Sequence, residues 1–185
     1  LWLRVPATMK FYFDGIVPPG LMAKDLILHA IGEIGFDGAT YRAMEFAGDA
    51  IAQLNVDERC TMCNMAIEAG AKSGIIEPDD VVIDYVERRK RKNAPPYTLF
   101  TSDDDADYEA VYRFDCSRIP PTVAMPHCPD RRAAAADLSD VAVERSYIGS
   151  CTGGKTTDML AAADILEGRE VAVDTFIVPA TTEVD

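Results

Sequence analysis

The spacing of apolar residues along the 185-residue chain predicts strands that alternate with helices. Residues 9–17 alternate apolar and polar side chains, which predicts a strand followed by a turn. In residues 22–35 apolar side chains recur every three or four positions, which predicts a helix that ends at Gly35. Residues 39–46 predict a second strand, with a loop at Gly48. This part of the chain is therefore of the α/β type.

Two further helices and a charged segment follow. A helix is predicted to begin after Asp57 and to end at Gly70 or Gly74, and residues 81–90 predict another. Residues 88–108 change from a basic run through a pair of prolines to an acidic run, which is typical of a linker. We place the linker at residues 93–104.

After the linker the pattern predicts a βαβ unit. Residues 141–150 alternate like a strand, residues 156–168 predict a helix, and residues 171–180 predict another strand. Strand, helix and strand in this order form a parallel sheet. We therefore predict an α/β fold in two consecutive partial domains, at residues 1–92 and 105–185, with the βαβ unit in the second.

The composition is that of a globular protein with a strong excess of acid. Hydrophobic residues make up 48% of the chain and charged residues 26%, and the formal net charge is −13. This charge repels phosphate groups, so it disfavours binding to nucleic acid or to an anionic membrane. Five cysteines at irregular spacing indicate a reducing compartment. We expect the cytoplasm, with a plastid or another organelle left open.

Both ends of the sequence have the character of interior segments. The chain starts in a strand-like run, without an initiator methionine and without the layout of a signal peptide. It stops directly after another strand-like run. We therefore interpret the sequence as part of a longer protein.

One loop carries the strongest candidate chemistry. Residues 149–156 read Gly-Ser-Cys-Thr-Gly-Gly-Lys-Thr and match the phosphate-binding pattern G-x-x-x-x-G-K-S/T, between a predicted strand and a predicted helix. Against this reading, only 29 residues follow Thr156, which leaves little room for a second strand that binds magnesium. The thiol of Cys151 would also contribute nothing to the binding of a phosphate. The residues alone leave a nucleotide-binding P-loop open as one hypothesis.

The same loop and several other stretches resemble the aconitase superfamily. The sequence YIGSCTGGKTTDMLAAADIL at 147–166 is similar to the cluster-binding signature of that family. Further similar stretches occur in the family's order at 1–15, 23–51, 57–80, 125–132 and 176–184. The resemblance implies an aconitase-like three-layer α/β/α fold and a hydro-lyase. It is strongest to the branch that interconverts 2-isopropylmalate and 3-isopropylmalate in leucine biosynthesis, and homoaconitase and other hydratases of the family are the alternative.

The resemblance implies a [4Fe–4S] cluster with Cys151 as one of three thiolate ligands, and with the fourth iron open to the substrate. The family's other two ligands lie beyond residue 185, so we expect this chain alone to hold no intact cluster and to be inactive. Cys60 and Cys63 lie in a predicted helix, and we do not interpret them as ligands. The loop glycines are expected to let the backbone pass close to the cluster; they are Gly149, Gly153 and Gly154.

The resemblance also points to an amide and a carboxylate. Asn64 and Glu68 are four residues apart in a predicted helix, so they project from one face, and the spacing alone leaves a structural pair equally open. The family has active-site residues at matching positions, which orient the leaving hydroxide or water. His29 and His127 are interpreted as structural. The resemblance further implies a small 2-hydroxy-acid substrate and a separate small subunit as partner.

Overall fold

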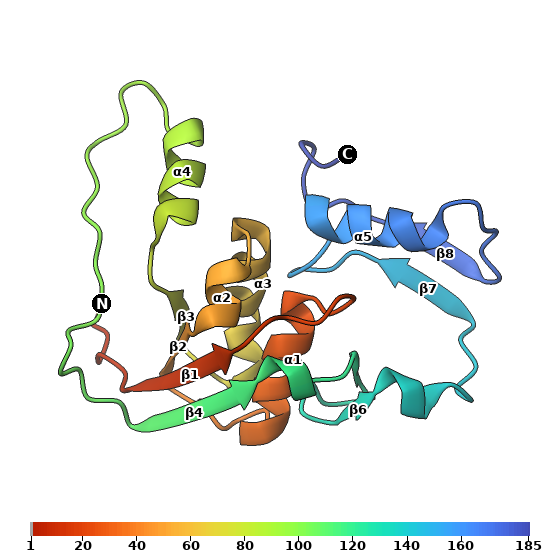
Figure 1. The fold of residues 1–185 in the computed structure, drawn as a ribbon, viewed down its shortest axis with the longest axis horizontal. Coiled ribbons are helices and arrows are strands. Elements are labelled where there is room, and N and C mark those ends of the chain that lie inside the picture. Colours follow the sequence, from red (N-terminus) through yellow and green to blue (C-terminus); the bar gives the residue numbers. More distant parts are fainter. Residues whose placement is uncertain (1) are drawn as a thin grey trace. The chain divides into compact units, whose positions relative to one another are not determined.

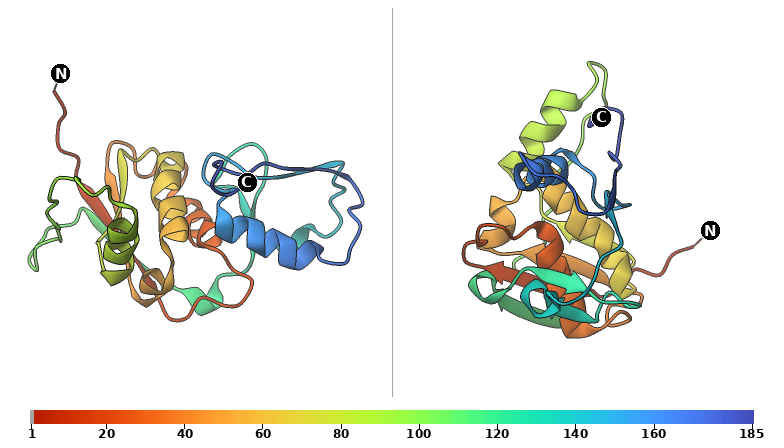
Figure 2. Two further views of the ribbon diagram at one scale, coloured as in Figure 1. Left: turned by 90° about the horizontal axis from the view of Figure 1, so that it is seen from above. Right: turned by 90° about the vertical axis from the view of Figure 1, so that its right-hand side faces the viewer.

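A computed structural model describes residues 2–185, and the chain folds into two compact units, Leu1–Ala133 and Ala134–Asp185 (Figures 1 and 2). The strands are β1 (Thr8–Asp14), β2 (Ala43–Ala47), β3 (Ser73–Ile76), β4 (Ala110–Asp115), β5 (Thr122–Ala124), β6 (Arg132–Ala134), β7 (Arg145–Ile148) and β8 (Asp174–Ile177). The α-helices are α1 (Ala23–Ile34), α2 (Asp49–Gln53), α3 (Val56–Met65), α4 (Asp80–Arg89) and α5 (Thr156–Leu166). Short 3-10 helices are η1 (Ala66–Ala69), η2 (Cys116–Arg118) and η3 (Ala135–Leu138). Among the helices of residues 2–185, none has both the length and the apolar composition of a membrane-spanning helix.

The first unit is built on a four-stranded parallel sheet with the strand order β3-β2-β1-β4. Alternate residues of β1 point to opposite faces of the sheet, and Met9, Phe11 and Phe13 are buried on one of them. Met44 and Phe46 of β2 stand in register beside Met9 and Phe11, so they extend this apolar face. The core of the unit lies on this side of the sheet.

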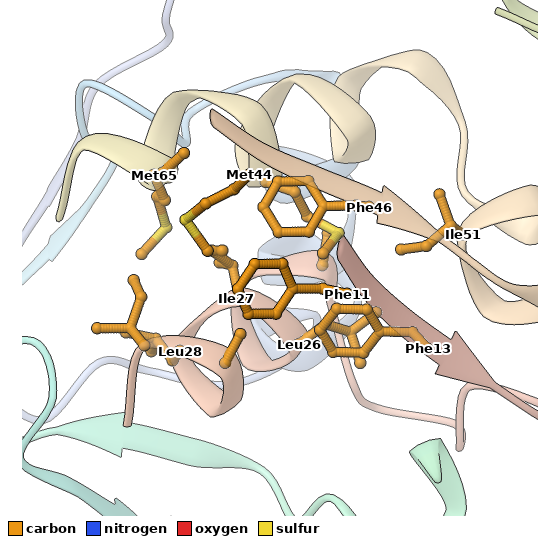
Figure 3. Packing of buried hydrophobic residues seen from close by; sticks show 14 of the residues in the cluster. Phe11, Phe13, Leu26, Ile27, Leu28, Met44, Phe46, Ile51 and Met65 are labelled. Atoms are coloured by element: carbon orange, nitrogen blue, oxygen red, sulfur yellow. The ribbon is translucent and has the colours of Figure 1, made fainter. Parts of the chain in front are cut away.

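Helices α1, α2 and α3 contribute the other half of that core. Leu26, Ile27 and Ile31 of α1 are fully buried, at the spacing that the sequence predicted for one helical face. Figure 3 shows Leu26 and Ile27 packed beside Phe11 and Phe13. The predicted α/β fold with a parallel sheet is thereby confirmed.

The segment between α4 and β4 contacts the opposite face of the sheet. Lys10 of β1 and Glu45 of β2 stand in register on this face and form an ion pair, with 2.9 Å between Nζ and Oε1. Ser102 and Tyr108 donate hydrogen bonds to the same carboxylate at 3.0 and 3.3 Å, and Glu45 is buried. Burial lowers the pKa of Lys10, but the hydrogen bonds to Tyr108 and Glu45 and the charge of Glu45 outweigh it. The pKa of Lys10 therefore lies above its usual value.

The predicted linker lies within the first unit, where it connects α4 to β4. Residues 93–104 contain no helix or strand and are almost entirely exposed, and Figure 1 shows them in green on the way from α4 to β4. β4 nevertheless pairs in parallel with β1. The boundary between the two compact units lies between residues 133 and 134 of the chain instead. The predicted division falls at the linker because this segment is polar. In the structure Ser102 and Tyr108 use their hydroxyl groups to bind Glu45 of the sheet, and β4 then pairs as the edge strand of the same sheet.

The second unit contains the predicted βαβ unit. β7 and β8 pair in parallel, with Ile148 beside Ile177, and α5 connects them. Of the residues in this unit, all of which the structure describes, only Thr152 and Gly154 are buried, and α5 has no buried side chain. The unit therefore has regular backbone pairing without an apolar core of its own.

The sequence pattern missed α2 and β3. The expected loop at Gly48 is the start of the five-residue helix α2. Of the two predicted ends of the helix after Asp57, Gly70 is the one found: α3 continues into η1, which ends at Gly70 with a φ of 81°, and the chain then enters β3. Gly74 of β3 lies so close to α3 that a Cβ there would stand 2.6 Å from the Cα of Cys63. Small residues fit both a helical and a strand pattern, so contact with β2 and α3 decides the structure here.

Candidate functional site

The candidate residues Asn64 and Glu68 lie near the end of α3 and in η1, and a reciprocal cap fixes the start of α3. Asn55 Oδ1 accepts a hydrogen bond from the Glu58 N–H at 3.1 Å, and Glu58 Oε2 accepts one from the Asn55 N–H at 2.9 Å. The sequence predicted the cap at Asp57. The structure moves it to Asn55, which combines an extended backbone with an acceptor side chain.

An ion pair between a buried arginine and a partly exposed aspartate fixes the position of α3 relative to its neighbours. Arg59 is 4% exposed, and its guanidinium donates to both carboxylate oxygens of Asp79 at 2.7 Å. It also donates to the carbonyls of Leu54 and Ala52, at 2.9 and 3.3 Å. The hydrogen bonds from Arg59 lower the pKa of Asp79, which caps α4 through two backbone N–H groups. One side chain thus ties α3 to the end of α2 and to the start of α4.

Asn64 and Glu68 are both exposed, and neither side chain makes a hydrogen bond or an ion pair with residues 2–185. The α-helix gives way to η1 between them, so the spacing of four residues is not that of one regular α-helix. They lie on successive turns at an α to 3-10 junction. Both groups are therefore available to a ligand.

Asn64 lines a depression of about 320 Å³ on the first unit. The depression is formed by the end of α3, by η1 and by the start of β3, and Glu68 lies outside its lining. The residues that line it beside Asn64 are Cys63, Ala66, Ile67, Ala71, Lys72, Ser73 and Gly74. The residues that line the depression thus include an asparagine, a serine and a lysine among apolar side chains.

Cys60 and Cys63 have poor properties as iron ligands. Cys60 is exposed and Cys63 is partly buried. Burial and, second to it, the nearby Cys60 raise the pKa of the Cys63 thiol to about 11, so the thiol stays protonated near neutral pH. The interpretation that the pair does not bind a cluster is supported by the lack, among residues 2–185, of any group of three His, Cys, Asp or Glu side chains placed to hold a metal ion.

Cys151 lies in the loop between β7 and α5, and it is exposed. The hydroxyl oxygen of Ser150 accepts hydrogen bonds from the N–H groups of Thr152 and Gly153, at 3.2 and 2.8 Å. Thr152 is 6% exposed. The loop therefore turns around Ser150 and leaves the neighbouring thiol at the surface.

Two loop glycines are required by the chain itself. A Cβ at Gly149 or Gly154 would stand 2.6 or 2.8 Å from the carbonyl oxygen of Val178, just after β8. Gly154 also has a φ of 73°, and its carbonyl accepts a hydrogen bond from the Ala180 N–H at 2.7 Å. Gly153 is less crowded, since the nearest atom to a Cβ there would be a side-chain oxygen at 3.1 Å. Close packing against the segment after β8 therefore explains why glycine is needed at positions 149 and 154, which the sequence pattern did not reveal.

Lys155 does not have the geometry of a phosphate clamp. Its Nζ donates to the carbonyl of Thr152 in the same loop. Its backbone N–H donates to Oδ2 of Asp158 at 3.0 Å, so a carboxylate caps the start of α5 where a phosphate would bind. This arrangement gives the nucleotide hypothesis no support.

The described residues contain no complete ligand set for a metal cluster. Among residues 2–185, no group of three His, Cys, Asp or Glu side chains is placed to hold a metal ion. The exposed Cys151 suits a single cluster ligand. A cluster with three protein ligands would take its other two from residues outside this chain.

Arg59 and Lys72 also belong to this region, and sequence patterns did not single them out. Charged residues in a predicted helix are normally exposed to solvent, so the sequence predicted no functional role for either residue. The burial of Arg59 could have been predicted, because Arg59 stands at helical spacing from Met62 and Ala66, which are both apolar and buried. Lys72 carries no comparable signal, since its place in the depression depends on the turn that follows η1.

Known proteins are similar to this chain over its whole length. The model of the Aconitase family (aconitate hydratase) matches residues 1–137. The 3-isopropylmalate dehydratase large subunit, chloroplastic, of Arabidopsis thaliana is 52% identical over 184 residues, which are 98% of this chain and 36% of that protein. Proteins named 3-isopropylmalate dehydratase large subunit from Hydrogenobaculum sp. and Thermodesulfovibrio yellowstonii are 47% and 46% identical over 100% and 99% of this chain, and 43% of each of those proteins is covered. The chain thus spans about two fifths of the length of these relatives.

Proposed function

The chain belongs to the aconitase family, and we propose that the whole protein is a hydro-lyase that interconverts 2-isopropylmalate and 3-isopropylmalate by removing and re-adding water. The observation that carries this proposal is the identity of 46% to 52% with three 3-isopropylmalate dehydratase large subunits over 98% to 100% of the chain. This reaction would place the protein in leucine biosynthesis.

Cys151 is proposed as one of three thiolate ligands of a [4Fe–4S] cluster. Its exposure supports this role, as does the loop that Ser150 and the segment after β8 hold in place. A bound cluster supplies a Lewis acid at the iron that no protein residue holds, which assists the loss of the substrate hydroxyl. The chain alone is expected to be inactive, because its described residues offer a single suitable thiolate.

Asn64 and Glu68 are proposed to orient the hydroxyl that leaves and the water that returns. An amide both donates and accepts hydrogen bonds, and a carboxylate accepts one and can hold a proton. Neither group is paired within residues 2–185, so both keep this capacity. The capping box of Asn55 and the ion pair of Arg59 support the role, since they hold α3 rigidly beneath these side chains.

A small subunit is the proposed partner, because the relatives are named as large subunits. The net charge of −13 opposes binding to nucleic acid. We propose a cytoplasmic location, or a plastid as in the name of the Arabidopsis relative. Homoaconitase or another hydratase of the family is the alternative, because the proposed residues act on the hydroxyl and the cluster rather than on the side chain of the substrate.

The test is turnover by the complete large subunit together with its small subunit, prepared without oxygen. We expect 3-isopropylmalate to form from 2-isopropylmalate, with a higher kcat/KM than for homocitrate. A preference for homocitrate would favour the alternative, and no turnover of either acid would contradict the proposal. Calorimetry with ATP and Mg²⁺ should show no binding, since Lys155 is folded onto its own loop.

A further inference from the structure

The residues that line the depression beside Asn64 include one cation, Lys72. We propose that Lys72 binds a carboxylate of the substrate in this depression. The inference rests on the proposed function, in which the substrate is a hydroxy acid with two carboxylates. It adds a residue that binds a carboxylate of the substrate, whereas Asn64 and Glu68 are proposed to act on the hydroxyl.

The backbone at Lys72 has a fixed position. Its N–H donates to the carbonyl of Arg42 at 2.8 Å, and the N–H of Tyr41 donates to the carbonyl of Gly70 at 3.3 Å. A Cβ at Gly70 would stand 2.7 Å from Oγ1 of Thr40, so the two segments pack as closely as a glycine allows. The start of the Lys72 side chain is therefore held in place by a neighbouring segment.

The ammonium group of the exposed Lys72 lies over the ring of Tyr41, a residue next to the depression but not in its lining. Nζ lies 4.7 Å from the centroid of the Tyr41 ring, at the distance of a cation–π contact. Tyr41 has a φ of 59°, which is uncommon for a residue other than glycine. Lys72 makes no ion pair with a carboxylate of residues 2–185. A cation that is positioned by a ring keeps its charge available to an incoming anion.

Such an available cation is needed here because the chain is acidic. The sequence has 31 Asp and Glu residues against 18 Lys and Arg residues, so the field of the protein repels a dicarboxylate. Two other basic side chains of the first unit are already engaged by carboxylates, Lys10 by Glu45 and Arg59 by Asp79. Lys72 is the cation that lies in one depression with Asn64.

The chemistry of this contact determines which kinetic constant it changes. An ammonium group is a compact charge with three donors, which suits a carboxylate. We assign the contact to the carboxylate on the carbon that bears the hydroxyl. Because no proton leaves this carbon, the contact is equally strong in the bound substrate and in the transition state. Such uniform binding lowers KM and leaves kcat unchanged.

The test is Lys72→Met in the complete two-subunit enzyme. We expect KM for 2-isopropylmalate to rise about 10- to 100-fold, as for the loss of a hydrogen bond to a charged group, with kcat nearly unchanged. Lys72→Arg, which keeps the charge, should restore most of the affinity. Lys24→Met is the matched control, because Lys24 is an exposed lysine on α1 away from the depression. An unchanged KM in Lys72→Met, or a fall in kcat alone, would overturn the inference.

A second measurement needs no variant. In the wild-type enzyme, saturating 2-isopropylmalate should slow the acetylation of Lys72 by acetic anhydride, followed by mass spectrometry, and should leave Lys24 unaffected. Equal rates at Lys72 with and without substrate would overturn the inference. If the enzyme turns over 2-isopropylmalate and Glu68→Gln impairs it while both Lys72 tests fail, the proposed function stands and this inference alone falls. If the wild-type enzyme does not turn over 2-isopropylmalate, both fall.

Discussion

The two units of the chain differ sharply in how they hold their candidate residues. In the first unit, fully buried Phe11, Phe13 and Leu26 belong to one continuous core beneath the helices. In the second unit, apolar side chains such as Ile165 and Phe176 are at least half exposed, and no large apolar residue is buried. Burial of apolar surface is the main source of stability. The first unit therefore has an internal source of stability that the second unit lacks.

The comparison shows two ways of positioning a functional group. Asn64 and Glu68 lie at the end of α3 and in η1, which are held in place by a core, a capping box and the ion pair of Arg59. Cys151 lies on a loop that is held by hydrogen bonds from backbone N–H groups to the Ser150 hydroxyl, and by glycines that allow close approach to the carbonyl of Val178. A loop can thus acquire a defined shape from local contacts even where no apolar core surrounds it.

The largest effect is expected from the loop. In the complete enzyme, Cys151→Ser should abolish both cluster retention and turnover, because a hard oxygen ligand is a poor substitute for a thiolate on iron. Iron content and turnover are measured on the same sample. Lys155→Ala is the control and should retain most activity, because its ammonium group donates to the Thr152 carbonyl of its own loop. Full iron content in Cys151→Ser would remove Cys151 from the ligand set.

A smaller effect is expected from the helix. Glu68→Gln should lower turnover about 10²-fold or more, as for the loss of a positioned acid–base group, and should leave the iron content unchanged. Glu144→Gln, at an exposed position in the second unit, is the matched control. Normal turnover in Glu68→Gln would mean that Asn64 and Glu68 are structural.

The difference in burial can be tested by truncating one phenylalanine in each unit. Phe13→Ala should lower the free energy of unfolding of the first unit by about 3–5 kcal/mol, since Phe13 is fully buried. Phe176→Ala should cost less than about 1 kcal/mol, since Phe176 is 50% exposed. Urea unfolding of the 185-residue chain measures both changes. Equal losses would contradict the contrast between the units.

The smallest effect concerns the ion pair beneath the helix. The pKa of Asp79 is lowered by Arg59, so this carboxylate stabilises the fold above its unfolded pKa of about 4, and the stabilisation is lost as the pH falls through the lower folded value. Asp79→Asn should therefore be less stable than wild type at pH 7, and the difference should shrink in acid. The effect is modest because the Asp79 side chain is 42% exposed. Thermal unfolding at both pH values measures it, and a difference that grows in acid would reverse the assignment.

The fold was predictable where periodicity and burial agree. α1 follows its apolar spacing to Gly35 because one face of the helix enters the core. β3 was not predictable, because Ser73-Gly74-Ile75-Ile76 follows small residues that continue a helical pattern, and its pairing with β2 decides its structure. The role of residues 93–104 was likewise hidden, since it depends on contacts of Ser102 with Glu45 across the sheet.

The candidate site was less predictable than the fold. The pattern at 149–156 fits a phosphate loop because glycines before a helix serve any ligand that needs backbone N–H groups. The structure adds that Gly149 and Gly154 are needed against Val178, a contact that no local pattern contains. Arg59 and Lys72 depend in the same way on residues brought close by the fold, Asp79 and Tyr41. Local sequence therefore indicates a loop and a helix, and the fold supplies their surroundings.

The most direct test of the cluster assignment is iron binding by the 185-residue chain itself. We propose Cys151 as the one cluster ligand among residues 2–185, in which no group of three His, Cys, Asp or Glu side chains is placed to hold a metal ion. The chain is incubated with ferrous iron and sulfide without oxygen, freed of excess reagent and checked for folding by circular dichroism. We predict that the folded chain retains no stoichiometric [4Fe–4S] cluster in its iron content or visible spectrum. A stoichiometric cluster on the folded chain would contradict this and would make Cys60 and Cys63 ligands.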